Sequence, residues 1–278
     1  MTQKRLDKGT RWFSPRITSL LENISAARTA IIEAPSGFGK TTAGEYLWSE
    51  ILSGLPDLAK SVRKVWHTCI DEAGPLLWRH FCDTVSKIDA PTGGRLAVLG
   101  LPDDDTFGDA AFTLEDIQCE RETWFFLDDF HNIERAAGAR VFSEFFRHRT
   151  ETLRVVILTR QFGDKALRGH AGVVWIDFRD LALSAVETKS FFASRGVRVT
   201  KKQAESAREI TGGCVQGLCL ELDRYRQTGK FSPLEDEGAW REIMRATIWK
   251  GLTEFQRDFL LRVSPFERYT LKQAAFLL

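Results

Sequence analysis

The stretch Ala34-Pro-Ser-Gly-Phe-Gly-Lys-Thr-Thr42 decides how the rest of the chain is interpreted. It follows a short apolar run, Ala30–Glu33, and it opens a helical pattern from Thr41 to Leu52. Phosphate-binding loops have the pattern G-x-x-x-x-G-K-[ST] between a strand and a helix. Here Ala34 replaces the first glycine and the closing Gly-Lys-Thr is intact. The alternative is an ordinary glycine-rich turn, and the flanking strand and helix patterns favour the phosphate-binding loop.

The residue types in this stretch suit a nucleoside phosphate with Mg²⁺. Gly37 and Gly39 allow backbone amides to turn inward around phosphate oxygens, and the following helix N-terminus adds partial positive charge. Lys40 is placed to reach the β- and γ-phosphates, and Thr41 offers its hydroxyl to the metal. We therefore predict that ATP or ADP is contacted by Pro35, Ser36, Gly37, Phe38, Gly39, Lys40, Thr41 and Thr42.

Four further apolar runs have the length of buried strands: Val65–Ile70, Trp124–Leu127, Leu153–Leu158 and Val173–Ile176. Nearly continuous apolar runs are typical of parallel strands that are covered on both faces. Stripes of apolar residues at helical spacing lie between them, for example over 77–88 and 141–146. The sequence therefore predicts an α/β fold, a doubly wound P-loop NTPase domain with a five-stranded parallel sheet.

Charged residues follow two of these runs. Asp128 and Asp129 end the third run, and Arg160 ends the fourth. Because ligands gather at the carboxyl ends of parallel strands, we expect Asp128 to hold Mg²⁺ through water and Asp129 to orient or deprotonate the attacking water. Arg160 is expected to face the γ-phosphate. Each also has a plainer interpretation, as an acidic turn or a surface arginine. His131 reads as a loop or packing residue, and we assign it no role.

The second half of the chain changes character. Ser184 and Glu187 have the spacing of a capping box, and Thr200 with Gln203 has it again. No further strand pattern appears, so we predict a P-loop nucleotide-binding domain over 1–182 and a small helical domain over 183–235. The final helical pattern begins near residue 271 and stops after about two turns, which predicts that the chain is cut from a longer protein.

Composition excludes several other classes of protein. The 278 residues include 39 Lys and Arg against 38 Asp and Glu, a net charge of +1. A domain dedicated to nucleic acid is usually far more basic, so we expect no DNA binding by this chain alone. The five cysteines show neither a CxxC pair nor a zinc spacing, which favours reduced thiols in a cytoplasmic protein. No signal peptide and no membrane-spanning run are predicted.

The phosphate loop, the aspartate pair and the strand-terminal arginine, in this order along the chain, resemble the STAND class of signalling P-loop ATPases. The closest resemblance is to the N-terminal nucleotide-binding region of MalT-like, LuxR-family bacterial transcription regulators. The segments that carry it are Pro15-Arg16-Ile17, 34–42, Val65-Trp66 with Asp71-Glu72, Phe126–Ile133, Ile157–Arg160, Glu187 with Phe191-Phe192, Thr211-Gly-Gly with Gly217-Leu218, and 259–270. Cys214 departs from the family, which usually has Trp at this position.

The resemblance implies further properties. Arg16 and Ile17 would contribute to nucleotide binding, and 236–278 would be the start of a truncated winged-helix domain. ADP would hold the domains closed, whereas inducer and ATP would favour an open form that self-associates and activates transcription. Slow hydrolysis would reset this switch. DNA would be bound only through a C-terminal domain outside this chain.

Other classes remain open on the sequence. A small-molecule kinase would need an acceptor pocket and usually an arginine-rich lid, and no clustered arginine segment of that kind follows the fourth strand. A ring-forming AAA+-type ATPase would need arginine fingers, for which Arg147, Arg149 and Arg154 are candidates. A STAND receptor for defence is a further alternative.

Overall fold

The computed structural model describes residues 11–54, 62–148, 150–229, 249, 252–266 and 270–277. The chain divides into two compact units, Met1–Arg224 and Tyr225–Leu278. The predicted P-loop domain and most of the predicted helical domain share the first unit. The predicted boundary at 235/236 and the candidate Arg149 lie outside the described residues.

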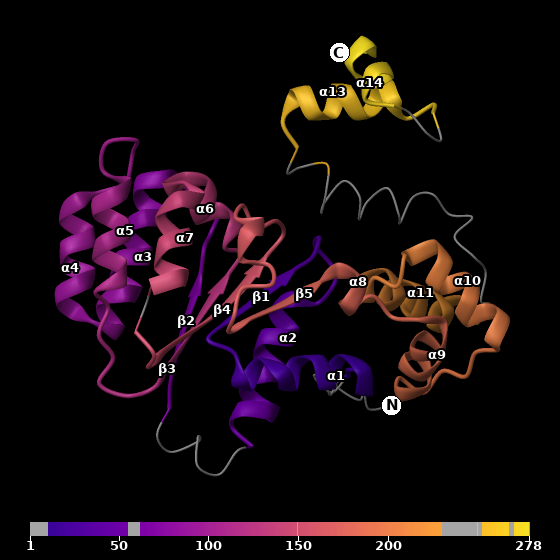
Figure 1. The fold of residues 1–278 in the computed structure, drawn as a ribbon. Helices are drawn as coiled ribbons and strands as arrows, with labels where there is room; N and C mark the ends of the chain where they lie inside the picture. The colour runs from indigo at the N-terminus through magenta and orange to yellow at the C-terminus, as the bar shows by residue number, and fades with distance from the viewer. Residues whose placement is uncertain are drawn as a thin grey trace, which may run out of the picture. The chain divides into compact units, whose positions relative to one another are not determined.

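A five-stranded parallel sheet forms the centre of the first unit (Figure 1). Its strands are β1 (Thr29–Glu33), β2 (Arg63–Thr68), β3 (Thr123–Asp128), β4 (Leu153–Thr159) and β5 (Val173–Asp177). They run in the order β2-β3-β4-β1-β5, and every neighbouring pair is parallel. The prediction of five parallel strands from the five apolar runs is confirmed.

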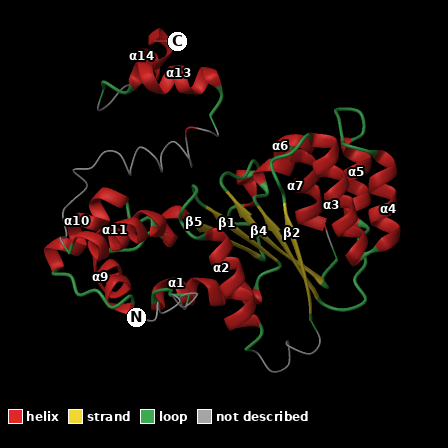
Figure 2. Cartoon of the chain, turned by 180° about the vertical axis from the view of Figure 1, so that it is seen from behind, coloured by secondary structure: helices red, strands yellow, loops and turns green. Residues whose placement is uncertain are grey.

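Helices cover both faces of the sheet, as Figures 1 and 2 show. On one side lie α3 (Gly74–Ile88), α4 (Ala90–Leu99), α5 (Phe107–Glu115), α6 (His131–Ala137) and α7 (Ala139–His148). On the other side lie α1 (Pro15–Glu22), the 3-10 turn η1 (Asn23–Ala26) and α2 (Lys40–Tyr46). The predicted helix over 41–52 does not stay α-helical, because Leu47–Leu52 (η2) is wound as a π-helix.

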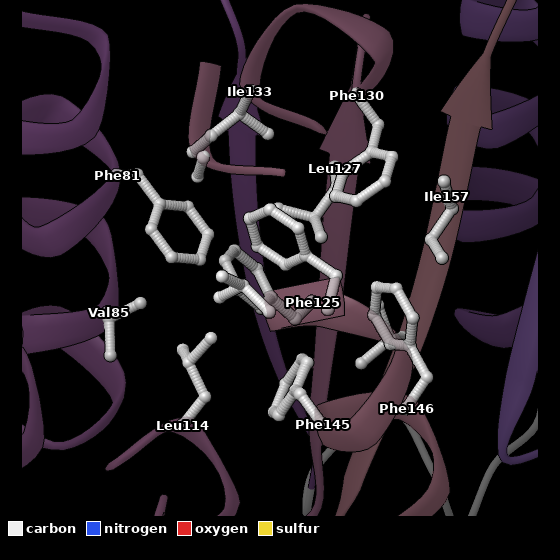
Figure 3. Close-up of a cluster of buried hydrophobic side chains, with 14 of the residues drawn as sticks. Phe81, Val85, Leu114, Phe125, Leu127, Phe130, Ile133, Phe145, Phe146 and Ile157 are labelled. Carbon is white, nitrogen blue, oxygen red and sulfur yellow. The ribbon is translucent and has the colours of Figure 1, made fainter. Parts of the chain in front are cut away.

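The main hydrophobic core lies between the sheet and the α3–α7 side (Figure 3). Phe125 and Leu127 project from β3 toward Phe81 of α3 and Phe145 of α7, and all four are completely buried. Burying a side chain of this size contributes about 1.5–3 kcal/mol, so this cluster stabilises the layer that supports the carboxyl ends of β3 and β4. The apolar stripes over 77–88 and 141–146 are the parts of α3 and α7 that supply it.

After β5 the described chain continues with α8 (Phe178–Leu181), α9 (Ala185–Ser194), α10 (Lys201–Thr211) and α11 (Val215–Thr228). The two predicted capping boxes are present at the starts of α9 and α10. Gly212 ends α10 with φ +61°, a left-handed conformation that glycine adopts without a steric penalty.

The second unit contains α13 (Glu254–Val263) and α14 (Leu271–Leu277). Thr253 and Gln256 form a capping box at the start of α13. Whether these helices open a winged-helix domain stays a prediction, as do the two predicted domain boundaries. In the part of the chain that is described, no helix combines the length and apolar character needed to cross a membrane. All five cysteines are free thiols.

Candidate phosphate-binding site

The loop between β1 and α2 has the backbone conformation that its glycines were predicted to permit. Gly37 has φ +90° and Gly39 has φ +79°. A residue with a Cβ rarely adopts such angles, so glycine is required at both positions by the turn itself. Gly39 is the N-cap of α2 and provides no side chain to cap it. The first amides of the helix are therefore left without a side-chain acceptor, as anion binding requires.

Lys40 is held beneath this loop. Its side chain is buried, and its Nζ donates a hydrogen bond to the carbonyl oxygen of Pro35 at 3.1 Å. Burial lowers the pKa of Lys40, while the charges of Asp129 and Asp128 act to raise it and that of Arg160 acts to lower it. The four predicted charged residues, Lys40, Asp128, Asp129 and Arg160, are therefore near enough for their charges to interact.

Thr41 and Asp128 form a direct pair. The Thr41 hydroxyl donates to Oδ1 and Oδ2 of Asp128, at 3.1 and 3.0 Å. Asp128 is buried, and burial raises its pKa although the Thr41 hydrogen bond acts against this. The pair places a hydroxyl and a carboxylate side by side, and such oxygen donors are the ligands that Mg²⁺ prefers.

Asp129 has the strained backbone conformation often found at functional sites. Its φ of +51° is the only positive value at a non-glycine residue in the described part of the chain. A residue other than glycine in this region costs on the order of 1–3 kcal/mol. The Asp129 amide donates to Oδ1 of Asp128 at 3.0 Å, which holds the turn closed. The two aspartates therefore act as one unit at the end of β3.

The strand order explains how Arg160 reaches this site. Because β4 lies between β3 and β1, its carboxyl end lies between the aspartate pair and the phosphate loop. Leu158 pairs with Asp128, and Thr159 pairs with Glu33. Arg160 is the first residue after β4, so it leaves the sheet between the two motifs. Its predicted contact with the γ-phosphate stays a prediction.

His131, to which the sequence assigned no role, is a further candidate residue of this site. It is the first residue of α6, and its Nδ1 is buried without a hydrogen-bond partner among the described residues. Burial lowers the pKa of His131 to about 4; Arg160 also lowers it, and Asp129 opposes this. The imidazole is thus neutral at physiological pH and lies with the charged groups of the site. Its spacing of two residues after Asp129 was the only signal in the sequence.

The first turn of α11 and the residue Cys214 just before it pack against the phosphate loop. The Gln216 amide donates to the Gly37 carbonyl oxygen at 3.0 Å. A Cβ on Gly37 would lie 2.6 Å from Oε1 of Gln216 and 3.1 Å from Sγ of Cys214. This second restriction on Gly37 is steric. The same distances place the side chain of Cys214 beside the loop. Cys214 is the residue that differs from the Trp usual in the resembled family.

Arg16 and Ile17 lie on α1 and have structural partners. The guanidinium of Arg16 donates to both carboxylate oxygens of Glu187, at 2.9 and 3.1 Å, and to the carbonyl oxygens of Asp180 and Ala182. Ile17 is buried in the core. Their predicted role in nucleotide binding stays a prediction. Of the remaining loop residues, Phe38 packs edge-on against Phe178, with ring centroids 6.0 Å apart.

Comparison with known proteins supports the fold. No protein-family model matches the sequence. Among solved structures, the chain is similar to a Walker-type ATPase of Pyrococcus abyssi, with 16% identity, a TM-score of 0.54, and coverage of 90% of this chain and 79% of that one. It is also similar to a STAND protein with a tetratricopeptide repeat sensor from Pyrococcus horikoshii, with 17% identity and a TM-score of 0.52. That match covers 95% of this chain but only 36% of the other. The chain therefore has the α/β fold of P-loop NTPases.

Proposed function

We propose that this chain is the ATP- and ADP-binding module of a signal transduction ATPase and that it hydrolyses ATP slowly. The observation that carries the proposal is that the charges of Asp128, Asp129 and Arg160 all act on the pKa of Lys40. Lys40 itself follows a loop in which two glycines, Gly37 and Gly39, have positive φ. Lysine, paired acids and a strand-terminal arginine at one sheet edge are the groups that phosphoryl transfer from a nucleoside triphosphate uses.

The residues present fit a nucleotide and a divalent cation. The phosphate loop offers backbone amides, and the Lys40 ammonium already donates a hydrogen bond toward the loop, to Pro35. Thr41 and Asp128 would hold Mg²⁺. When bound, the metal would neutralise charge on the β- and γ-phosphates. Lys40 is buried with its charge partly offset by the two aspartates, so an added phosphate would complete its pairing.

Hydrolysis needs a base, a positioned water and a cation at the γ-phosphate. In this proposal water attacks the γ-phosphorus, the bond to the bridging β–γ oxygen breaks, and Asp129 accepts the proton that the water loses. The neutral His131 would hold the water by hydrogen bonding, since its buried Nδ1 has no partner among the described residues. Arg160 would pair with the γ-phosphate and so distinguish ATP from ADP.

A bound nucleotide could change the arrangement of the helices that follow the sheet, because α11 contacts the phosphate loop. The Gln216–Gly37 hydrogen bond joins the first turn of α11 to the phosphate loop, so a ligand that changes the conformation of that loop acts on α11 directly. We propose that ADP favours the closed arrangement and that ATP favours self-association of the full-length protein. A ligand shifts such an equilibrium only by its differential affinity for the two states, which is the role assigned to Arg160.

The finer assignment is to a bacterial LuxR-family transcription regulator. Its support is the order of motifs over 15–17, 34–42, 126–133 and 157–160, and the similarity to a STAND protein of which this chain spans 36%. DNA would be bound by another part of that regulator, because this chain has a net charge of only +1.

The test is to identify the nucleotide that the purified protein carries. The protein is denatured after extensive washing, and the supernatant is separated by ion-exchange chromatography. We expect ADP in near-stoichiometric amount, or its uptake when added. A protein that releases no nucleotide and binds neither ADP nor ATP at millimolar concentration would contradict the proposal.

A further inference from the structure

The loop that carries Arg160 is anchored on the protein along its whole length. It joins β4 to the 3-10 turn η3 (Lys165–Leu167). At its start, the buried Thr159 hydroxyl donates to the carbonyl oxygen of Gln161 at 2.7 Å. At its centre, Phe162 is 1% exposed and packs against Phe130 and Trp175, with ring centroids 5.8 and 5.6 Å away. Arg160 therefore projects from a fixed backbone.

Two carboxylates bind the backbone amides of this loop. Oε1 of Glu33, the last residue of β1, accepts a hydrogen bond from the Phe162 amide at 3.2 Å and from the Lys165 ammonium. Oε1 of Glu134, on α6, accepts one from the Gly163 amide at 2.9 Å. Burial raises the pKa of Glu134 to about 7, although the hydrogen bond from the Gly163 amide acts against this. Its Oε1 accepts that hydrogen bond in either protonation state, so both amides have an acceptor.

Gly163 gives independent evidence of how closely the loop is packed. A Cβ on this residue would lie 2.9 Å from the Cβ of Ala139 and 3.0 Å from Oε1 of Glu134. The backbone thus approaches α6 and α7 more closely than any other residue would allow. Beside it, Asp164 pairs with Arg147 of α7 at 3.0 Å.

The two carboxylates come from the two segments that Arg160 must be aligned with. Glu33 directly precedes Ala34, the first residue of the phosphate-loop motif. Glu134 lies in α6, the helix that begins at His131, immediately after the Asp128–Asp129 turn. The Arg160 loop is therefore tied to β1 on one side and to the segment after β3 on the other.

We propose that Glu33 and Glu134 are positioning residues that hold the Arg160 loop in register with the phosphate loop and Asp129, so that the guanidinium meets the γ-phosphate. This inference rests on the proposed nucleotide-binding function. ADP makes no contact that requires the alignment, whereas ATP does. The carboxylates thus set the preference for ATP over ADP without touching either nucleotide.

The first measurement compares two substitutions at one position. Glu134→Ala removes the acceptor for the Gly163 amide, whereas Glu134→Gln retains an oxygen acceptor of the same reach. We expect Glu134→Ala to weaken binding of a non-hydrolysable ATP analogue about tenfold, as a misplaced group does, and to leave ADP affinity within about twofold. Glu134→Gln should restore the parent ratio. Glu151→Ala, which removes an exposed carboxylate paired with Arg28, is the matched control.

A double-mutant cycle tests whether the effect passes through Arg160. If Glu134 acts by positioning that arginine, adding Glu134→Ala to Arg160→Ala should not change the ATP-to-ADP affinity ratio further. Hydrogen–deuterium exchange of the parent protein tests the contact without any substitution, and the amides of Phe162 and Gly163 should be protected. Glu33→Ala provides a second route to the same loosened loop if Glu134→Ala fails to fold.

The results distinguish the positioning role of Glu33 and Glu134 from the proposed nucleotide-binding function. Unprotected Phe162 and Gly163 amides, or an unchanged affinity ratio in folded Glu134→Ala and Glu33→Ala, would overturn the positioning role alone. Equal losses for both nucleotides would do the same, because they indicate a general structural effect. A parent protein that binds neither nucleotide would instead overturn the proposed function, and the positioning role with it.

Discussion

The hydroxyl of Thr41 donates hydrogen bonds to both carboxylate oxygens of Asp128, joining the first turn of α2 to the end of β3. If this pair holds Mg²⁺, Asp128→Ala should weaken ATP binding in the presence of Mg²⁺ by about tenfold or more and should change binding in EDTA far less. Calorimetric titrations with and without the metal check this. Asp104→Ala, in an exposed turn, is the control. Equal losses with and without Mg²⁺ would remove Asp128 from the metal site.

We assign to Asp129 the role of accepting the proton from the attacking water. Asp129→Ala should leave ATP binding within a few-fold of the parent and reduce hydrolysis by about 10²-fold or more, the contribution of a general base. Phosphate release under saturating ATP measures the rate. An Asp129→Ala variant that hydrolyses ATP at the parent rate would be incompatible with this role.

Arg160 is expected to bind the γ-phosphate and so to distinguish ATP from ADP. Arg160→Ala should weaken binding of an ATP analogue about tenfold or more, through the loss of one charge-assisted contact, with ADP affinity nearly unchanged. The plainer alternative is a structural arginine, for which both nucleotides would lose affinity together and the melting temperature would fall. Measuring both affinities and the melting temperature on the same variant separates the two.

The Arg16–Glu187 pair predicts a dependence of stability on pH. Burial of Glu187 acts to raise its pKa, but hydrogen bonds from Arg16, Ser14 and Ser184 outweigh this and lower it from 4.5 to about 2. Because the folded pKa lies below the unfolded one, the stabilisation is complete above about pH 4.5 and is lost as the pH falls toward 2.

Glu187→Gln should therefore lower the free energy of unfolding by about 1–3 kcal/mol at pH 7. The difference from the parent should shrink as the pH falls from about 5 to 3. Urea unfolding at several pH values measures this, with Glu205→Gln, an exposed carboxylate on α10, as the control. A difference that stays constant across this range would show that charge is not the cause.

Local patterns in the sequence predicted the sheet correctly, and they also pointed to the main residues of the candidate site. Continuous apolar runs identified all five strands because a parallel sheet is buried on both faces. The residues after the third and fourth runs identified Asp128, Asp129 and Arg160 because parallel strands end at one edge. Capping boxes at Ser184 and Thr200 depend on neighbours three residues apart, so they too could be read locally.

What could not be predicted depends on contacts between distant segments. Arg16 and Glu187 are 171 residues apart, and the sequence alone gave Arg16 no partner. The hydrogen bond from Phe162 to Glu33 spans 129 residues and requires the strand order, which apolar periodicity does not contain. His131 became a candidate residue of the site only through the burial of its Nδ1. The π-helical turns after Tyr46 likewise have no local signature in this sequence.

The central claim is that the loop around Lys40 binds the phosphates of ADP and ATP. Calorimetric titration of ADP into the parent protein and into Lys40→Ala, with Lys202→Ala as an exposed-lysine control, tests it most directly. We predict saturable binding to the parent and the control, and a loss of about 100-fold or more in Lys40→Ala, because a buried ammonium–phosphate contact is removed. An unchanged ADP affinity in Lys40→Ala would contradict the claim.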